Sequence, residues 1–284
     1  MTPADKLAAG EARRQFALEV SQDAGAIDVA RAALLIAAEE EPGRCDVARC
    51  LARLDEMGAE ARARVERRGG SAIEALNKYL FEELGFAGDQ ANYYAPRNSL
   101  LNYVLERRQG IPITLSVVYM EVGRRAGLEV EGIGMPGHFI VRAADELEGR
   151  AVLVDPFYGK VVDEDECQQR LDTIYGGQVP LGEEHLRAVG PRDILIRVLG
   201  NLKGIYVQSQ LYRRALAAVE RILLLAPLDP DEHRDRGMLL AQLDRLTPAI
   251  EEVQSYLSSS ADAPDADSVR EQLKKMQIRL AMLN

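Results

Sequence analysis

The sequence has no tryptophan, few cysteines and histidines, and no long hydrophobic segment. Its longest uninterrupted apolar run, Ala32 to Ala38, has seven residues, far fewer than the ~20 that a membrane-spanning helix needs. The segment from Met1 to Glu11 contains no apolar run of the length found in signal peptides. We therefore expect neither a transmembrane nor a secreted protein, and no association with a membrane.

Metal-ligating residues are equally scarce, with 3 cysteines and 3 histidines in 284 residues. An odd number of cysteines does not make a disulfide framework in a chain of this length. Cys45 and Cys50 lie close in sequence and Cys167 lies far away, a spacing that matches no common zinc site. We expect no metal and no cofactor, and a location in the reducing cytoplasm.

Positive charge is in the minority, with 35 basic against 45 acidic residues and a net charge of −10. Such a protein repels a phosphate backbone on average, which disfavours nucleic-acid binding. Hydrophobic residues make up 47% and charged residues 28% of the chain, proportions typical of a folded protein. At ~150 residues per domain, the length allows one large domain or two modest ones.

Residues 1–85 have the pattern of a helical region. Alanine, leucine, glutamate and arginine dominate, and the periodicity predicts helices over Phe16–Glu40, Asp46–Arg68 and Ser71–Leu84. Pro42 and Gly43 separate the first two of these helices. The sequence therefore predicts an N-terminal region without strands.

Residues 86–191 mix helical and extended patterns. The clearest helical pattern extends over Ile111–Ala126. This segment is apolar almost all round, which is typical of a buried helix rather than a surface one. Pro112 stands in its first turn and Gly127 just past its end, the usual positions of these two residues at a helix start and stop. We expect this helix at the centre of a folded core.

Three β-like runs follow the buried helix, at Glu129–Ile133, His138–Arg142 and Ala151–Val154. Asp163, with a glutamate three residues later, has the spacing of a capping box and predicts a helix that ends near Tyr175. A short antiparallel sheet packed on the buried helix accounts for this order of elements. The middle region is therefore predicted to be α+β.

Residues 192–284 return to a helical pattern and contain a repeat. The segments Gln210–Ala215 and Asp244–Ala249 align at an offset of 34 residues, the period of tetratricopeptide repeats. Pro227 lies where such a repeat usually turns, and a terminal helix is predicted from about Asp267. Helix pairs of this kind stack into a concave surface, so we predict a short repeat region that binds a protein partner. A generic helical bundle is the alternative.

His138 and Asp155 are the strongest candidates for chemistry. His138 is predicted to open one strand and Asp155 to end the next. If these strands pair as a hairpin, the two side chains lie at one edge of the sheet, where a carboxylate fixes the tautomer of the imidazole, as general-base catalysis requires. A histidine at the start of a strand more often has a structural hydrogen-bonding role, and the spacing leaves both roles open.

Five separated motifs are distinctive: Tyr93–Asn102, Val104–Arg108, Gly110–Ser116, Pro136–Phe139 and Val154–Phe157. In this order they closely resemble the bacterial SirB family, in which a transglutaminase-like core is followed by tetratricopeptide repeats. The likeness extends over residues 86–175 at least, and the order of the regions extends it over most of the chain.

The resemblance implies a papain-like scaffold for cysteine catalysis. In active members of that superfamily a cysteine opens the buried helix, and a histidine and an aspartate follow on two strands. His138 and Asp155 match the last two positions, whereas the helix-start position falls on Pro112. Because no cysteine lies between Cys50 and Cys167, the resemblance implies a core without its nucleophile.

Three side chains are alternatives for the missing nucleophile. Thr114 and Ser116 lie within two turns of Pro112, but a hydroxyl is a much weaker nucleophile than a thiolate, and both can instead bond the backbone at the helix start. Cys167 can fold back toward the histidine or pack as a small apolar residue. We expect the helix-start role for the hydroxyl groups and the packing role for the thiol.

The remaining groups of the motifs are candidates for the walls of a cleft. Asn98 suits either the N-cap of the following helix or a cleft wall, and Arg107 and Arg108 suit a helix end better than an acidic-ligand clamp. The predicted lining comprises Tyr93, Tyr94, Asn98, Pro112, Thr114, Ser116, Pro136 and Phe157.

These observations predict an α+β, mostly helical protein with a papain-like, transglutaminase-like core. We expect a helical region at 1–85, the core with its short antiparallel sheet at 86–191, and tetratricopeptide-like repeats at 192–284. The leading functional hypothesis is a cytoplasmic, nucleophile-deficient module that holds a protein partner through the core cleft and the repeats. The alternative is an amide-bond hydrolase or transferase in which His138 and Asp155 activate a non-cysteine nucleophile or water.

Overall fold

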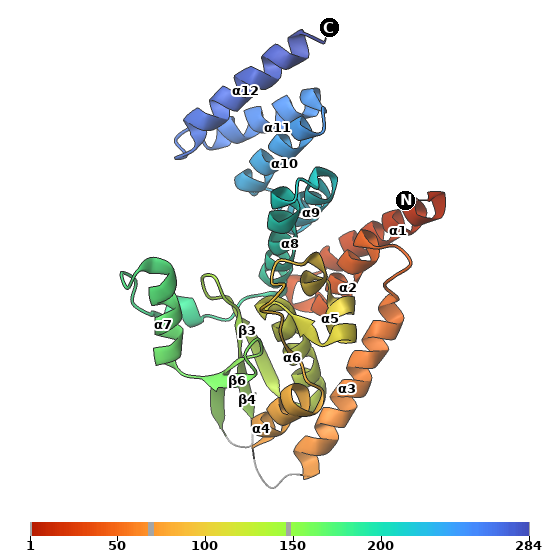
Figure 1. Ribbon diagram of the computed structural model, residues 1–284, viewed down its shortest axis with the longest axis vertical. Helices are drawn as coiled ribbons and strands as arrows, with labels where there is room; N and C mark the ends of the chain where they lie inside the picture. The colour runs from red at the N-terminus through yellow and green to blue at the C-terminus, as the bar shows by residue number, and fades with distance from the viewer. Residues whose placement is uncertain (1, 68–70, 146–148, 284) are drawn as a thin grey trace. The chain divides into compact units, whose positions relative to one another are not determined.

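The computed structural model describes residues 2–67, 71–145 and 149–283 of the chain (Figure 1). Helices predominate, and the strands of the described part form one four-stranded and one two-stranded sheet. The predicted α+β, mostly helical class is therefore confirmed. The chain divides into two compact units, Met1–Val198 and Leu199–Asn284. The predicted domain boundaries at 85/86 and 191/192 remain predictions.

The first unit begins with helices, and one helix that the sequence predicts is divided into two. The bounds are α1 Pro3–Val20, α2 Val29–Glu40, α3 Val47–Arg67 and α4 Ala72–Asn77. The predicted single helix over Phe16–Glu40 is wrong, because the chain leaves the helix at Ser21 and makes a 3-10 turn over Ala24–Ala26. Asp28 then caps α2 by accepting a hydrogen bond from the backbone N–H of Arg31 at 2.9 Å.

The other two predicted N-terminal helices are present. α3 starts one residue after the predicted Asp46, and the predicted end at Arg68 lies outside the described residues. α4 continues into a π-helical turn over Lys78–Glu83, where the backbone N–H of Leu84 donates to the carbonyl of Tyr79 at 2.9 Å. The π turn keeps the chain helical over most of the range that the sequence predicts.

The predicted buried helix is α6, Pro112–Ala126, and it lies between α3 and strand β3 in the first unit (Figure 1). Pro112 occupies the first turn, where its missing N–H has no partner to lose. Gly127 ends the helix at a φ of 93°, a left-handed conformation that favours glycine. Although α6 is apolar and buried, no helix within residues 2–67, 71–145 and 149–283 has the length and apolar character to cross a membrane.

The predicted antiparallel sheet is present and has a fourth strand. In order its strands are β3 Glu129–Ile133, β4 Ile140–Asp145, β5 Arg150–Asp155 and β6 Lys160–Val162. Val141 of β4 lies opposite Val154 of β5, so the predicted hairpin forms. The prediction that His138 opens a strand is wrong. Gly137, at a φ of 65°, and a hydrogen bond from the His138 N–H to the carbonyl of Met135 (3.2 Å) curl the chain into a turn before β4.

Further elements precede the buried helix and follow the sheet. They are β1 Ala87–Gly88, the 3-10 turn η3 Pro96–Ser99, α5 Leu101–Arg107, β2 Gln109–Gly110, α7 Glu164–Tyr175 and the 3-10 turn η4 Glu183–Leu186. β1 and β2 pair in parallel. The predicted capping box opens α7, because Asp163 accepts from the N–H of Glu166 at 2.8 Å and Glu166 accepts from the N–H of Asp163 at 3.4 Å.

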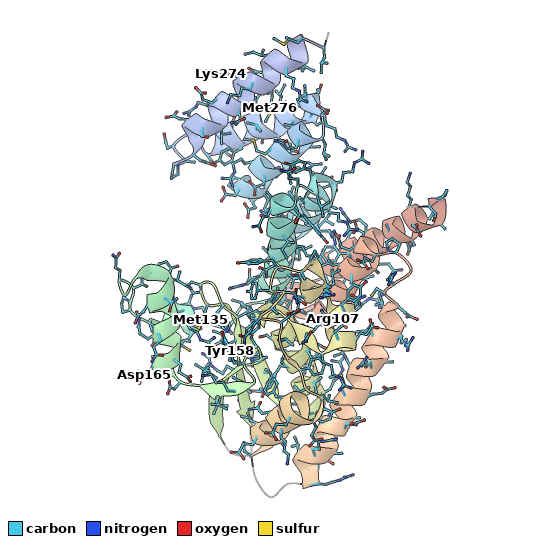
Figure 2. All side chains as sticks on the ribbon, in the orientation of Figure 1. Arg107, Met135, Tyr158, Asp165, Lys274 and Met276 are labelled. Atoms are coloured by element: carbon cyan, nitrogen blue, oxygen red, sulfur yellow. The ribbon has the colours of Figure 1, made fainter. Side chains whose placement is uncertain are left out.

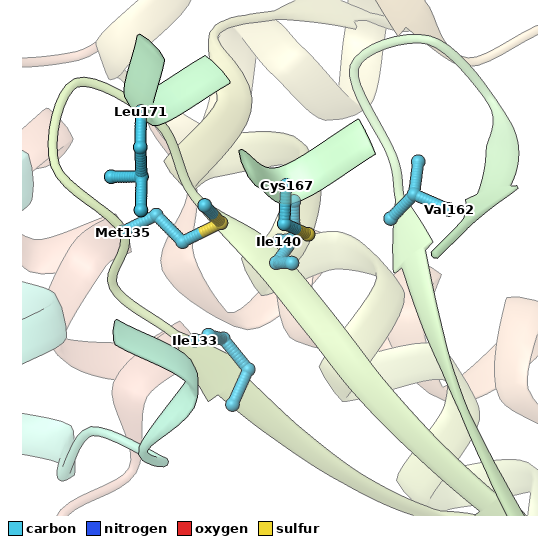
Figure 3. Close-up of a cluster of buried hydrophobic side chains, with 6 residues drawn as sticks. All are labelled: Ile133, Met135, Ile140, Val162, Cys167 and Leu171. Carbon is cyan, nitrogen blue, oxygen red and sulfur yellow. The ribbon is translucent and has the colours of Figure 1, made fainter. Parts of the chain in front are cut away.

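A hydrophobic cluster joins the sheet to α7 (Figure 3). Its buried members are Ile133, Met135, Ile140, Val162, Cys167 and Leu171. Cys167 and Leu171 lie one turn apart on α7 and pack toward the ends of β3 and β4. Cys167 is fully buried, and burial raises the pKa of its thiol. This thiol is a packing group in the described structure.

The second unit consists of helices that repeat. α8, Pro191–Gln208, contains the boundary between the units, and α9 Tyr212–Leu225, α10 Pro230–Gln242, α11 Leu246–Ser259 and α12 Ala266–Ala281 follow. α9 and α11 begin at the two aligned positions of the predicted repeat. Gln210 and Asp244, before these helices, share a left-handed backbone conformation. Ala215 and Ala249 are both fully buried, as small residues are where helices of such repeats touch.

Candidate functional site

The turn before β4 and the end of β5 bring His138 and Asp155 into contact. Strands that pair in register place the residues beyond their ends side by side. The Nε2 atom of His138 lies 2.8 Å from Oδ2 of Asp155. Asp155 is fully buried, whereas the His138 side chain is 13% exposed. The imidazole therefore faces the surface of the first unit with the carboxylate behind it.

Each oxygen of the Asp155 carboxylate has two partners. Oδ2 accepts the bond from His138 and also pairs with the guanidinium of Arg170 on α7. Oδ1 accepts from the backbone N–H groups of Phe157 at 2.9 Å and Tyr158 at 3.3 Å. Burial raises the pKa of Asp155, but the hydrogen bonds and charges of His138 and Arg170 outweigh this and hold the pKa below its ordinary value. The carboxylate is ionised, and Arg170 balances its charge.

Aromatic rings lead from the imidazole to the surface. The ring of Tyr158, labelled in Figure 2, stacks on His138 with 6.2 Å between centroids, and Phe157 meets the imidazole edge-on at 6.3 Å. Tyr93 contacts Phe157 at 6.0 Å and Tyr94 at 5.1 Å. Tyr158 and Tyr94 are 54% and 70% exposed. Beside the histidine the site therefore offers flat apolar surface with hydroxyl groups.

An arginine on α8 holds the turn that carries the histidine. Arg197 donates from Nη2 to the backbone carbonyl of Met135 at 2.7 Å and to that of His138 at 2.6 Å. These two bonds fix both ends of the turn. Pro136 and Gly137 lie between them, where the left-handed conformation of Gly137 suits glycine. The position of the imidazole is thus set by backbone contacts as well as by Asp155.

Asn98 belongs to a buried polar network. Its Nδ2 donates to Oδ2 of Asp89 at 3.2 Å and to the carbonyl of Asn92 at 2.7 Å, and its Oδ1 accepts from Arg107 at 3.0 Å. Arg107 also pairs with Asp89 at 3.3 Å. Of the two roles that the sequence left open for Asn98, the N-cap is not the one it has, because Leu100 is the N-cap of α5 and no side chain caps it. These hydrogen bonds stabilise the conformation of the segment that contains Tyr93 and Tyr94.

The residues at the start of α6 are buried, and none of them is hydrogen-bonded to His138. The hydroxyl of Thr114 donates to the carbonyl of Asn98 at 2.7 Å. Ser116 is fully buried, and its hydroxyl has no hydrogen-bond partner among the described residues. Pro112 supplies neither a nucleophile nor an N–H group. Across the described ranges, no hydroxyl or thiol hydrogen bonds to the His138 side chain, whose partner is Asp155.

This geometry limits what the site can do chemically. In a neutral imidazole the nitrogen that faces a carboxylate carries the proton, so Nδ1 of His138 has the free lone pair. Nδ1 can accept a hydrogen bond from a ligand or from water, but no described side chain is placed for it to deprotonate. In the part of the chain that the structure describes, no three histidine, cysteine or acidic side chains come together as metal ligands.

Sequence reasoning missed three charged residues of the site, Arg170, Arg197 and Asp89. Arg170 had a usable signal, because it lies on the turn of α7 between Cys167 and Leu171, and a charged residue beside a buried helix face needs a partner. Arg197 and Asp89 had none, because their partners are backbone carbonyls and side chains of distant segments.

The chain is similar to known proteins along most of its length. A family model described as Transglutaminase-like superfamily matches residues 48–200, and one described as Tetratricopeptide repeat matches residues 202–274. A UPF0162 protein of Xylella fastidiosa (strain Temecula1) is 38% identical over 202 residues, which cover 70% of this chain and 71% of the relative. A UPF0162 protein of Vibrio cholerae is 30% identical over 211 residues (74% and 78%), and Protein SirB1 of Salmonella typhimurium is 26% identical over 212 residues (75% and 78%). No solved structure matches the chain.

Proposed function

The chain belongs to the transglutaminase-like superfamily and, within it, to the SirB family, and we propose that it is a non-catalytic member that binds another protein. One observation carries the proposal. The Asp155 carboxylate pairs with both His138 and Arg170, while no described hydroxyl or thiol bonds to the imidazole. Such a dyad has neither a nucleophile to deprotonate nor an unbalanced carboxylate to stabilise an imidazolium ion.

The start of α6 supports the same proposal. Thiol catalysis needs a thiolate at a helix N-terminus near an imidazole, and Pro112 occupies the position that the family resemblance assigns to it. Proline also lacks the backbone N–H that would stabilise an oxyanion. The hydroxyl of Thr114, at the start of the helix, already donates a hydrogen bond to the carbonyl of Asn98. The site has kept the shape of a catalytic dyad without the group that reacts.

The helical repeats are the proposed binding surface. Tetratricopeptide helix pairs present a concave face, and a cavity of about 250 Å³ lies in the second unit between α9 and the segment that precedes α11. Arg213, Leu216 and Arg245 are among the residues that line it. This combination of apolar surface and guanidinium groups suits a protein segment. The aromatic surface beside His138 is the second proposed contact.

The proposed setting follows from composition. We place the protein in the cytoplasm, since 3 cysteines in 284 residues give no disulfide framework. We also propose that it binds no nucleic acid, because a net charge of −10 repels phosphate on average. Its partner is therefore sought among the proteins of that compartment.

The catalytic alternative, an amide hydrolase or transferase, rests on the 2.8 Å contact between His138 and Asp155. The test is amide hydrolysis and amine incorporation with a panel of peptide amides, measured for the wild type and for His138→Ala. The proposal predicts that both proteins match the buffer rate. Turnover by the wild type that His138→Ala abolishes, with an unchanged Tm, would establish the enzyme instead.

Binding is tested on the full chain with charge reversals in the second unit. A partner is first isolated by cross-linking and identified, and the purified partner is then titrated against the wild type, Arg245→Glu and Lys274→Glu. Lys274, labelled on α12 in Figure 2, is exposed and does not line the cavity, so it is the matched control. We expect Arg245→Glu to weaken binding about tenfold or more and Lys274→Glu to leave it unchanged. Equal affinity for all three would remove the repeats as the binding surface.

A further inference from the structure

A second cavity, of about 660 Å³, lies in the first unit and does not involve the dyad. Its walls come from the N-terminal turns of α3, with the residues just before them, and from α5. The residues on which the argument depends are Arg44, Arg49, Cys50, Arg53, Asn102 and Glu106. The volume lies within the ~300–1,000 Å³ that is typical of small-molecule sites.

Three guanidinium groups line this cavity, and among the described residues they have no hydrogen-bond or ion-pair partner. Within the described part of the chain, the side chains of Arg44, Arg49 and Arg53 have no hydrogen bond or ion pair. Other arginines of the first unit are paired, such as Arg125 with Asp55 at 2.7 Å. Arg49 and Arg53 are four residues apart on α3 and therefore lie on one face. Guanidinium groups in this arrangement bind carboxylates.

Carboxylates and a buried amide complete the lining. Glu56 and Glu106 also line the cavity, as does Asp46, which caps α3 by accepting from the N–H of Arg49 at 3.0 Å. Asn102 is 8% exposed, and its Oδ1 is buried without a hydrogen-bond partner among the described residues. A buried acceptor in this state can take a hydrogen bond from a ligand or from water. The cavity therefore suits a ligand with carboxylate groups, an ammonium group and an amide N–H.

A reactive thiol lies among these groups. Cys50, in the N-terminal part of α3, lines the cavity between Arg49 and Arg53 in sequence. The interaction with the neighbouring Cys45 thiol lowers the pKa of Cys50, and the charges of Arg53 and Arg49 add to this against burial and the charge of Asp46. The same contact raises the pKa of Cys45. Thiols beside arginines at a helix N-terminus react readily as thiolates.

We propose that this cavity binds the disulfide of a small thiol that carries carboxylate and ammonium groups, and that Cys50 undergoes exchange with it. The Cys50 thiolate attacks one sulfur of the bound disulfide and forms a mixed disulfide. The bond between the two sulfur atoms of the small molecule breaks, and its second half leaves as a thiolate that takes a proton from water.

Cys45 then resolves the mixed disulfide. Its thiol gives up a proton to water and attacks the sulfur of Cys50, which releases the second small thiol and leaves a Cys45–Cys50 disulfide. Two protein thiols are thus oxidised to one disulfide, and one small disulfide is reduced to two thiols. Cys45 lies five residues before Cys50, and its thiol, which donates to the carbonyl of Leu34 at 3.4 Å, must leave that bond to react.

The probe is oxidised glutathione, whose halves carry carboxylates, an ammonium group and amide N–H groups. The reduced full-length protein is mixed with it, quenched by alkylation at intervals and mapped by peptide mass. A neutral disulfide, bis(2-hydroxyethyl) disulfide, is run in parallel, and each rate is divided by that of the same reagent with N-acetylcysteine. We expect a Cys45–Cys50 disulfide in the wild type and a stable glutathione adduct on Cys50 in Cys45→Ser.

Variants of α3 separate ligand recognition from plain thiol reactivity. Arg49→Gln and Arg53→Gln are each expected to lower the ratio of the glutathione rate to the neutral-disulfide rate about threefold, the scale of an exposed ion pair. A change in the pKa of Cys50 alone would slow both reagents alike. Arg62→Gln removes the same charge from an exposed position of α3 outside the cavity and should change nothing. Cys167, fully buried, is the internal control and should stay unmodified.

Three results would overturn the proposal. The first is modification of Cys50 no faster than that of Cys167. The second is an equal normalised rate for the two disulfides, or rates that Arg49→Gln and Arg53→Gln do not change. The third is a Cys45→Ser protein that accumulates no more adduct than the wild type. None of these results depends on whether the dyad is catalytic.

Discussion

The best-connected carboxylate of the first unit and the paired histidine of the second unit hold charge in different surroundings. The first unit concentrates it in buried networks, where the fully buried Asp155 holds Arg170, His138 and two backbone N–H groups. The second unit also buries charge, at Arg221 and at the Glu232 that pairs with Lys203, but its pair of His233 with Glu252 at 2.7 Å is partly exposed. Buried networks fail when one member is lost, whereas exposed pairs contribute little each. We therefore expect the loss of Asp155 to destabilise the protein more than the loss of the His233–Glu252 pair.

The largest expected effect comes from removing the centre of the first network. Asp155→Ala leaves the guanidinium of Arg170, the imidazole of His138 and two N–H groups without their acceptor. Breaking a buried ion pair in this way costs about 3–5 kcal/mol. Hydrogen exchange resolved by peptide should show lost protection in β5 and α7, with α9–α12 unchanged. Equal loss in both units would end the contrast between them.

Removing only the cation should cost less and should change the acid response. Arg170→Met is expected to lower the free energy of unfolding by about 2 kcal/mol. The pKa of Asp155 is below its ordinary value in the folded state, so its contribution is present above ~3.9 and is lost as the pH falls through the folded pKa. Without Arg170 the folded pKa rises toward the unfolded value, so the contribution is smaller and its loss is complete at a higher pH.

Acid unfolding followed by circular dichroism measures this shift. Arg142→Met is the control, because its carboxylate partner, Glu131 at 3.1 Å, is exposed and its second acceptor, the carbonyl of Leu186 at 2.6 Å, does not titrate. An acid midpoint that Arg170→Met leaves where it was, or that Arg142→Met moves as far, would contradict the role of Arg170.

Packing should decide the stability of the second unit. At Gly237 of α10 an added Cβ would lie 2.6 Å from Cγ2 of Val253 and 3.1 Å from the carbonyl of Ala249. Gly237→Ala is therefore expected to cost about 1.5 kcal/mol through overpacking. At Gly204 of α8 the added Cβ meets nothing within 4 Å, so Gly204→Ala should stabilise the protein slightly, because alanine favours a helix. Urea unfolding compares the two, and equal effects would refute the packing argument.

The smallest expected effect is the pH dependence of the second unit. The hydrogen bonds of His233 to Glu252 and to the carbonyl of Pro227 raise the pKa of His233 above its ordinary 6.5. Its stabilisation is therefore complete below pH 6.5 and is lost as the pH rises through the folded pKa. NMR titration should show the raised pKa, and His233→Gln should remove the difference in urea midpoint between pH 5.5 and pH 8.5. A His233 pKa at or below 6.5 would contradict the pairing.

Local sequence signals predicted helices in both units. The repeat set the starts of α9 and α11, because buried alanines recur at its period, and the apolar run at Ile111–Ala126 predicted α6 well. The capping box at Asp163 predicted the start of α7 for a similar local reason. Each signal comes from neighbours along the chain, which is where helix starts and packing periods are determined.

The site was predictable only in part, because long-range contacts build it. The contact of His138 with Asp155 followed from the expected hairpin, but the place of His138 in a turn depended on Gly137 and on Arg197 from α8. The partnership of Arg170 with Asp155 depended on the docking of α7 against the sheet. Chain segments far apart in sequence leave no periodic signal when they meet.

We propose that this core has a dyad but no nucleophile. The most direct measurement is the intact mass of the full-length protein after incubation with activated acyl esters and amides, for the wild type and His138→Ala. We expect no acylated species that depends on His138. An acyl group mapped to Thr114, Ser116 or Cys167 in the wild type, and absent from His138→Ala with the same Tm, would show that the site is catalytic.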